Sequence, residues 1–242
     1  MPKVSVIIRT LNEKEHLAEL LAALRAQDFQ DFEVVVVDNE STDGTAELAE
    51  TSGCTVVTIK RERFSFPKSM NFGALYATGE ILIFTVGHAL PVRKDWISCA
   101  VEHLADPKVA GVYSPVIPSK GCSLVERFYY YPGYLLAQYR GPHKAAHTGM
   151  GIFGGTNIAI RRALWLEHGF DHRFGAGGDD GEWAGWALGL GYDLICDHRF
   201  AVHHSHNLGI SGLYKQLKYW SKLGQPHEFQ RSDLAFRTDL KF

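Results

Sequence analysis

Four groups of polar residues carry side chains that bind ligands or move protons. They are Asp38 with its polar neighbours, His88 after Gly87, the acidic run Asp179-Asp180-Gly181-Glu182, and the histidines of Val202-His203-His204-Ser205-His206. A carboxylate accepts hydrogen bonds and protons, and a neutral imidazole binds metal ions. The secondary-structure elements that position these groups decide whether they meet.

Asp38 directly follows an apolar strand predicted over Phe32 to Val37, and it opens a polar run that ends at Thr45. Its carboxylate offers only acceptors, so it suits the imide N–H of a pyrimidine base. The alternative is that Asp38 only caps the turn that follows the strand.

His88 stands at the end of the continuous apolar run Ile81 to Val86, which is typical of a central strand buried on both faces. Gly87 lets a ligand approach the backbone closely, and we expect Pro91 to block further sheet pairing. Ligands of open α/β sheets bind at the carboxyl ends of strands. His88 is therefore placed to meet a ligand, unless it is a solvated turn residue.

The C-terminal histidines alternate along a short strand. Two residues that are two positions apart share one face of a strand, so His204 and His206 can converge while His203 points away. Solvated loop histidines are the alternative.

The acidic pair Asp179-Asp180 comes before a helix predicted to begin near Glu182. Besides acting on a ligand, such a pair could serve only as an acidic cap that the helix dipole stabilises.

The first half of the chain alternates strands and helices. Strands are predicted over 4–10, 32–37, 55–59 and 81–86, and helices over 45–51 and 67–77. Another helix follows the first strand, and we expect Asn12 to cap it in a capping box with Glu15. This order predicts an α/β fold with a mostly parallel, doubly wound sheet. In the second half we expect a helix over 96–104, strands over 109–117 and 193–195, and a closing helix over 211–223.

Composition excludes several protein classes. A net charge of −2 and a pI near 6.6 argue against a nucleic-acid partner. Four scattered cysteines predict reduced thiols rather than a zinc site or disulfides. The chain enters a strand by Val4 and has no apolar run of ~18 to 20 residues, so we expect a cytoplasmic protein without a signal peptide or transmembrane helix. Neither a G-x-G-x-x-G motif after the first strand nor a phosphate-binding P-loop occurs.

Two longer stretches carry a resemblance. Val4-Ser-Val-Ile-Ile-Arg-Thr-Leu-Asn-Glu13 with Val34 to Thr45, and Lys68-Ser-Met-Asn-Phe-Gly73 with Ala77 to Phe84, resemble the family-2 inverting glycosyltransferases in order and spacing. The match covers roughly residues 4 to 206. It implies a single domain of the GT-A-like, Rossmann-related type, with a nucleotide-sugar-binding half (1–105), an acceptor and catalytic half (106–225) and a tail (226–242).

The resemblance also implies roles for individual residues. The nucleotide-sugar site would comprise Thr10, Asn12, Glu13, Asp38, Ser41, Lys68, Asn71, Gly155 and Asn157. The acidic run resembles the segment that carries the family's catalytic base, so Asp180 would take the proton of the acceptor hydroxyl. Asp179 and Glu182 would position that base, and Trp183 would lie on the acceptor side.

One motif departs from the family. Relatives usually end the fourth strand in Asp-x-Asp, which holds a divalent cation on the donor diphosphate, whereas this chain has Val86-Gly87-His88-Ala89. Some branches, rhamnosyltransferase-like ones included, have a related strand end. We expect His88 to hold the cation with His204 or His206, weakly without nucleotide, and with Mn²⁺ favoured over Mg²⁺ because Mg²⁺ prefers oxygen ligands. The alternative is that protonated His88 or Lys68 replaces the cation.

The expected partners are a nucleotide-sugar donor and a glycan, lipid-linked or small-molecule acceptor. We expect non-processive transfer of one sugar because long membrane helices are absent. The aromatic-rich segment from Leu124 to Tyr139 is either a membrane-facing or acceptor-binding surface, at the inner membrane face, or a core or homodimer contact. Two alternative functions are a sugar-phosphate nucleotidylyltransferase and a non-catalytic sugar- or partner-binding module. The first would need a glycine-rich basic loop after the first strand, which Thr10 to Lys14 lacks. The second would not need Asp179-Asp180, which this chain has.

Overall fold

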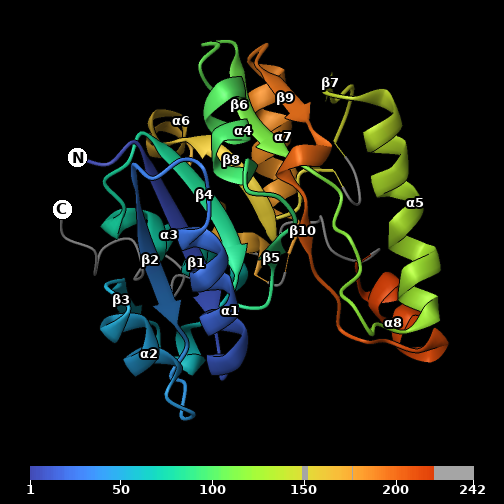
Figure 1. Cartoon of the computed structure of the whole chain (residues 1–242). Helices are drawn as coiled ribbons and strands as arrows, with labels where there is room; N and C mark the ends of the chain where they lie inside the picture. The colour runs from blue at the N-terminus through green and yellow to red at the C-terminus, as the bar shows by residue number, and fades with distance from the viewer. Residues whose placement is uncertain (149–151, 176, 221–242) are drawn as a thin grey trace.

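A computed structural model describes residues 1–148, 152–175 and 177–220, and it contains an eight-stranded mixed sheet with helices on both faces (Figure 1). The strand order is β3-β2-β1-β4-β8-β6-β9-β7. The strands are β1 (Val4–Thr10), β2 (Phe32–Asp38), β3 (Thr55–Thr58), β4 (Ile81–Val86), β6 (Val109–Tyr113), β7 (His143–Lys144), β8 (Asn157–Arg161) and β9 (Asp193–Cys196). β1 to β4 pair in parallel, as does β6 with β9, while β8 runs antiparallel between β4 and β6. The predicted α/β class and mostly parallel sheet are confirmed.

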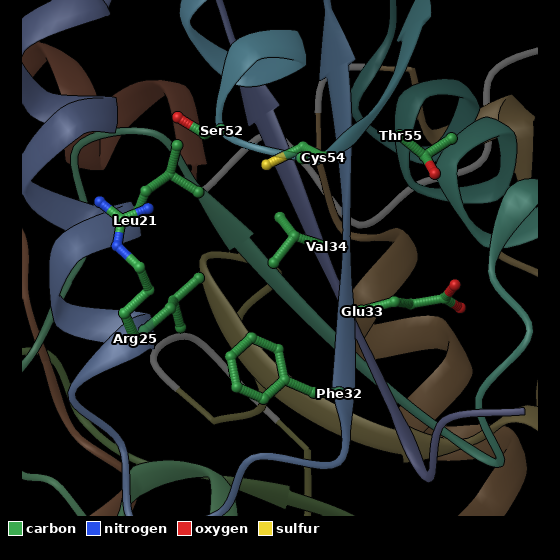
Figure 2. A pocket seen from close by; sticks show the side chains of 10 residues that line it. Leu21, Arg25, Phe32, Glu33, Val34, Ser52, Cys54 and Thr55 are labelled. Atoms are coloured by element: carbon green, nitrogen blue, oxygen red, sulfur yellow. The ribbon is translucent and has the colours of Figure 1, made fainter.

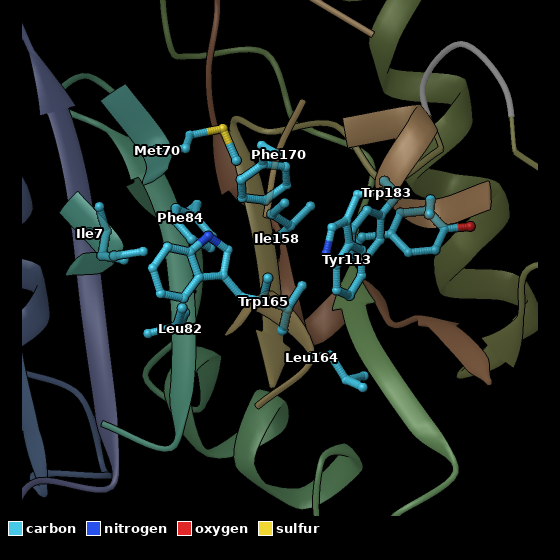
Figure 3. Packing of buried hydrophobic residues seen from close by; sticks show 14 of the residues in the cluster. Ile7, Met70, Leu82, Phe84, Tyr113, Ile158, Leu164, Trp165, Phe170 and Trp183 are labelled. Carbon is cyan, nitrogen blue, oxygen red and sulfur yellow. The ribbon is translucent and has the colours of Figure 1, made fainter. Parts of the chain in front are cut away.

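The helices cover the two faces because successive strand residues point to opposite sides. On one face pack α1 (Lys14–Arg25), α2 (Thr45–Thr51) and α4 (Trp96–His103); on the other pack α3 (Phe66–Tyr76), α6 (Arg162–Glu167) and α7 (Asp179–Gly189). Figure 3 shows the core on the face covered by α3, α6 and α7, in which Trp165 and Phe170 lie beside Phe84 and Trp183 lies near Tyr113. All seven residues of β1 are buried, although Ser5, Arg9 and Thr10 are polar.

The remaining helices lie at the edge of the molecule. α5 (Leu124–Arg140) forms the right border in Figure 1, with α8 (Ile210–Trp220) beside it. Within the described residues no helix is long and apolar enough to cross a membrane. The last three residues of the closing helix predicted over 211–223, and the predicted tail at 226–242, lie outside the described residues.

Three local predictions were wrong. α1 is preceded by Glu13 rather than capped by Asn12, because Thr45 and Asp43 accept the N–H groups of Glu13 and Lys14. Pro91 does not end pairing: β5 (Leu90–Pro91) pairs antiparallel with β10 (Val202–His203), which tolerates the missing N–H because the ladder is short and at an edge. α7 begins at Asp179, so the acidic pair lies inside its first turn.

Candidate active site

The carboxyl ends of three neighbouring strands bring the predicted polar residues to one edge. β1 ends at Thr10, which pairs in register with Asp38 at the end of β2, and Arg9 pairs with Val86 at the end of β4. Gly87 and His88 follow immediately. The parallel register therefore aligns side chains that are up to 78 positions apart in sequence, from Thr10 to His88.

Asp38 has a free acceptor at this edge. Its side chain is buried, Oδ2 accepts the N–H of Ser41 at 2.9 Å, and Oδ1 has no hydrogen-bond partner among the described residues. Asn12 joins the same loop: its N–H donates to Ser41 Oγ, and its Oδ1 accepts the N–H of Thr42, both at 2.8 Å. A buried carboxylate oxygen without a partner is costly unless a ligand donates to it.

Glu13 links the end of β1 to His88. Thr10 Oγ1 donates to Glu13 Oε2 at 3.0 Å, and the other carboxylate oxygen binds His88 Nδ1 in a short hydrogen bond. Gly87 makes this approach possible, since a Cβ there would lie 2.8 Å from Thr10 Oγ1. The carboxylate fixes the orientation of the imidazole and leaves Nε2 as its open ligand atom.

Three histidines converge. The ring centroids of His88 and His204 are 4.7 Å apart and stacked, His206 lies 5.3 Å from His88 and 4.7 Å from His204, and one nitrogen of each ring lies within 4.8 Å of the others. His88 Nε2 is buried and has no hydrogen-bond partner among the described residues. Burial, with His88 and His206 nearby, lowers the pKa of His204 to about 3, so this imidazole is neutral. The three side chains fit a divalent transition-metal ion, whereas His203 points to the carbonyl of Pro118.

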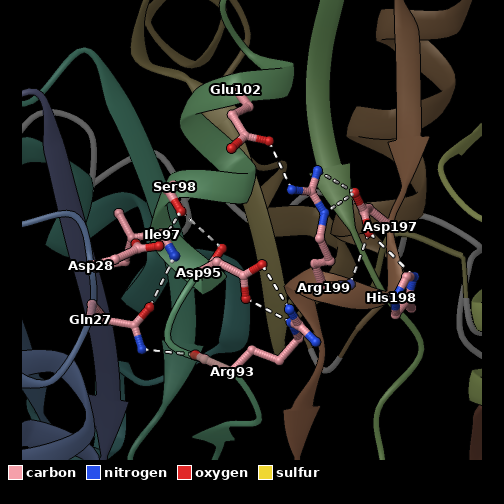
Figure 4. Close-up of polar contacts among 10 residues, drawn as sticks. All are labelled: Gln27, Asp28, Arg93, Asp95, Ile97, Ser98, Glu102, Asp197, His198 and Arg199. Carbon is pink, nitrogen blue, oxygen red and sulfur yellow. Dashed lines mark hydrogen bonds and ion pairs between the residues drawn. The ribbon is translucent and has the colours of Figure 1, made fainter.

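Tertiary contacts hold residues 202–207, which we call the histidine segment, in place. The N–H of His204 donates to Ile117 O at 2.8 Å, and the buried carboxylate of Glu126 accepts the N–H groups of His206 and Asn207. Upstream, Asp197 and Arg199 tie the chain to α4 through His103 and Glu102, and Figure 4 shows the Asp197–Arg199–Glu102 part of this network. Burial opposes the ionisation of Asp197, but these hydrogen bonds hold its pKa below the usual range.

The acidic pair lies in the first turn of α7, after Gly178. Asp180 Oδ2 accepts the N–H of Gly155 at 2.7 Å, and Oδ1 accepts the N–H of Gly181 at 2.7 Å. Asp179 is more deeply buried, and its Oδ2 has no hydrogen-bond partner among the described residues. Burial raises the pKa of both carboxyls, and the charge of Asp180 raises that of Asp179 further. Asp180 is the more accessible carboxyl of the two.

Arg9 is a site residue that the sequence analysis missed. It is buried at the end of β1, donates from Nη2 to Gly155 O at 3.0 Å, and places its guanidinium 5.1 Å from the ring centre of Phe66. Burial lowers the pKa of Arg9, and the charges of Asp179, Asp180 and Glu13 oppose that change. The signal was present: Arg9 is the one ionisable residue of an otherwise uncharged, seven-residue strand.

Three predicted ligand contacts are instead packing residues. Asn71 uses its whole amide within the protein, donating to Phe170 O and pairing with His172 Nε2 while accepting from Trp165 Nε1 and the Phe170 N–H. Asn157 accepts from Trp96 Nε1 and donates to Phe200 O. Trp183 is fully buried and donates to His168 O. Since an amide has four hydrogen-bonding positions, Asn71 has none left for a donor sugar.

The other predicted residues also differ from expectation in detail. Both backbone groups of Gly155 are taken by Arg9 and Asp180, so this glycine holds the carboxylate rather than a diphosphate. Glu182 bonds His168 Nε2 at 3.0 Å. Lys68 lies half-buried in the first turn of α3, and its N–H donates to Ser65 Oγ.

A separate pocket lies at the opposite edge of the sheet (Figure 2). It is lined by Phe32 and Thr55, the first residues of β2 and β3, together with Leu21, Arg25 and Cys54. Burial raises the pKa of the Cys54 thiol to about 11, so the thiol is not a nucleophile near neutral pH. None of the site residues described above lines this pocket.

Known proteins are similar to this chain in sequence and in fold. The family model "Glycosyl transferase family 2" matches residues 5–166. Glycosyltransferase AglE of Haloferax volcanii is 27% identical over 208 residues, and the match covers 82% of this chain and 65% of that sequence. This chain therefore spans slightly less than two thirds of that relative's length.

Solved structures show the same fold. Mannosyltransferase PcManGT from Pyrobaculum calidifontis in complex with GDP-Man and Mn²⁺ aligns with a TM-score of 0.63 and 24% identity, over 98% of this chain and 69% of that one. Staphylococcus aureus TarS 1-349 in complex with UDP-GlcNAc aligns with a TM-score of 0.59 and 21% identity, over 86% and 59%. Because the family model covers well over half of the sequence, this chain belongs to glycosyl transferase family 2.

Proposed function

We propose that the protein transfers one sugar from a nucleoside-diphosphate sugar to an acceptor hydroxyl, with inversion at the anomeric carbon. One observation carries the proposal: β1 connects, through the hydrogen bonds of Arg9 and Thr10, a carboxylate pair on one side with a histidine cluster on the other. Family membership and the complexes of PcManGT with GDP-Man and of TarS with UDP-GlcNAc support this reading.

The donor would bind along the edge from Asp38 to His88. The unpaired Oδ1 of Asp38 accepts the imide N–H of a pyrimidine base. His88, His204 and His206 would hold a divalent cation, with Mn²⁺ favoured over Mg²⁺ because all three ligand atoms are nitrogens. Such an ion, when bound, offsets the negative charge that develops on the departing diphosphate.

Asp180 would act as the general base. Its carboxylate accepts the proton of the acceptor hydroxyl while that oxygen bonds to the anomeric carbon and the bond from that carbon to the diphosphate oxygen breaks. A single displacement of this kind inverts the anomeric configuration. Asp179 is too deeply buried to reach a sugar, and its raised pKa keeps a proton within the pair.

The test is incubation with a panel of nucleotide sugars, Mn²⁺ and candidate acceptors. We expect release of nucleoside diphosphate, and a product whose anomeric configuration, read by NMR, is opposite to that of the donor. Release of pyrophosphate would indicate nucleotidyl transfer instead, and donor binding without turnover would indicate a binding module.

A further inference from the structure

The apolar stripe of α5 faces away from the protein. Leu124, Phe128, Tyr131, Leu135 and Tyr139 are spaced i, i+4, i+7, i+11 and i+15, which places them on one side of a helix. We call these five residues the α5 stripe. All five are exposed, with Phe128 at 79% and Tyr139 at 90%.

The buried side of α5 lies roughly opposite the stripe. At 100° per residue, Glu126 and Ala137 fall about half a turn away from Leu124 and Leu135, and these two residues are buried. Tyr129 and Leu136 add exposed apolar area next to the stripe. An amphipathic helix normally turns its apolar stripe to the core, so this orientation indicates a surface that another phase or molecule covers.

All but one of the charged residues in the two segments around the stripe are basic. Residues 117–148 and 203–220, which include α5 and α8, contain Lys120, Arg127, Arg140, Lys144, Lys215 and Lys218. The one acid in these two segments is Glu126, whose side chain is buried against the histidine segment. Among these cations, Lys144 forms an ion pair with Asp193 at 2.7 Å, and Lys218 also interacts with another group. This concentration of positive charge stands out in a chain whose net charge is −2.

We propose that the α5 stripe docks on a bilayer that contains anionic phospholipids. Aromatic and leucine side chains would enter the boundary between headgroups and acyl chains, while Arg127 and Arg140 meet lipid phosphates. A second copy of this chain is a poorer occupant. A two-fold contact through the same face places the cations of one copy against those of the other, with no exposed acid from these segments between them.

Docking would place the candidate active site at the membrane surface. The carboxylate of Glu126 on α5 accepts the N–H of His206 at 3.0 Å and of Asn207 at 2.9 Å, so the helix is joined directly to the histidine segment. The docking itself does not depend on the proposed glycosyl transfer, and the two can fail separately.

The test is flotation of the full chain with vesicles of phosphatidylcholine alone or mixed with phosphatidylglycerol. The stripe variant is Phe128→Ser/Leu135→Ser, and its control is Leu166→Ser/Leu190→Ser, which removes two leucines of similar exposure from α6 and the end of α7. We expect wild type and control to bind the anionic vesicles, and the stripe variant to bind about 10-fold more weakly or worse. Arg127→Gln/Arg140→Gln should reduce binding to anionic vesicles, and added salt should weaken wild-type binding.

Three results would overturn the docking proposal. They are absence of wild-type binding to anionic vesicles, equal binding by the stripe variant that retains its circular dichroism spectrum, and a wild-type dimer that dissociates in the stripe variant without any vesicle binding. Donor-sugar binding, measured by calorimetry in parallel, should be the same in wild type and stripe variant, so its loss across all proteins would count against the proposed function and not against docking.

Discussion

Arg9 and Asp180 bind the same residue from two sides: Arg9 Nη2 donates to the carbonyl oxygen of Gly155 at 3.0 Å, and the N–H of Gly155 donates to Asp180 Oδ2 at 2.7 Å. A cation from the end of β1 is thereby fixed beside both carboxyls of α7. Burial raises the pKa of Asp180, and the N–H donors and the charge of Arg9 act in the opposite direction. In the proposed mechanism, Arg9 is a positioning residue that also favours the ionised form of Asp180.

Arg9→Gln should shift the pH dependence of turnover. Without the guanidinium the carboxyl pair ionises less readily, so the acid limb of the kcat profile should move to higher pH by ~1 unit or more. Arg9→Lys keeps the charge and should restore part of the wild-type position. Profiles that coincide in all three proteins would remove Arg9 from this role.

Asp179→Asn should change how stability depends on pH. Burial and the charge of Asp180 raise the pKa of Asp179, while Arg9 opposes them and Glu182 adds to them. Between the unfolded value of about 3.9 and the raised folded value, the folded protein binds more protons, so the free energy of unfolding falls as pH rises. The variant should lose the part of this slope that Asp179 contributes in urea unfolding, whereas Asp28→Asn, which alters an exposed carboxyl hydrogen-bonded to Ser98, should keep the full slope. An unaltered slope in Asp179→Asn would contradict the assignment.

Asp38→Ala should weaken binding of a pyrimidine nucleoside diphosphate by about 1.5 to 3 kcal/mol, the scale of a charged hydrogen bond. Calorimetry with uridine and guanosine diphosphates separates base recognition from loop support. The hydrogen bond from Ser41 to Asp38 is lost for both nucleotides alike, so an equal loss for both would show that the carboxylate only shapes the loop.

The histidine cluster should bind Mn²⁺ before any donor is present. From the sequence we predicted weak metal binding without nucleotide. The structure brings three imidazoles together, one of them oriented by Glu13, so the protein alone offers three nitrogen ligands to one ion. Titration followed by electron paramagnetic resonance should show that His88→Ala and His204→Ala abolish tight binding, and that Glu13→Gln weakens it ~10- to 100-fold. His203→Ala is the matched control, because its ring contacts the Pro118 carbonyl. Undiminished turnover in excess chelator would exclude a metal role.

The strands and helices, and the positions of Asp38 and His88 at the carboxyl ends of strands, could be predicted from the sequence, because apolar runs and turn residues are local signals. Strands β1, β2 and β4 lie within one residue of their predicted bounds, and the approach of His204 to His206 was expected from their alternation. We also expected His88 beside His204 or His206, but we did not expect the β5–β10 pair that brings these segments together, because Pro91 was assumed to block pairing.

The roles of the buried polar residues could not be predicted from the sequence, because hydrogen-bond partners far away along the chain decide them. Asn71 is satisfied by Trp165 and Phe170, more than 90 residues away, and Asn157 by Trp96 and Phe200. A motif marks such an asparagine without telling whether its amide points to a ligand or into the core. Arg9 shows the converse, since its charge within an apolar strand was visible but its partner Gly155 was not.

The most direct test of the account is the turnover of Asp180→Asn. The substitution keeps the size of the side chain and an oxygen for the Gly155 N–H, but the amide cannot take the acceptor's proton. We predict a loss of ~10² to 10⁴-fold in kcat, with donor affinity by calorimetry equal to that of wild type. Wild-type turnover in a variant that binds donor normally would contradict the assignment of Asp180 as the base.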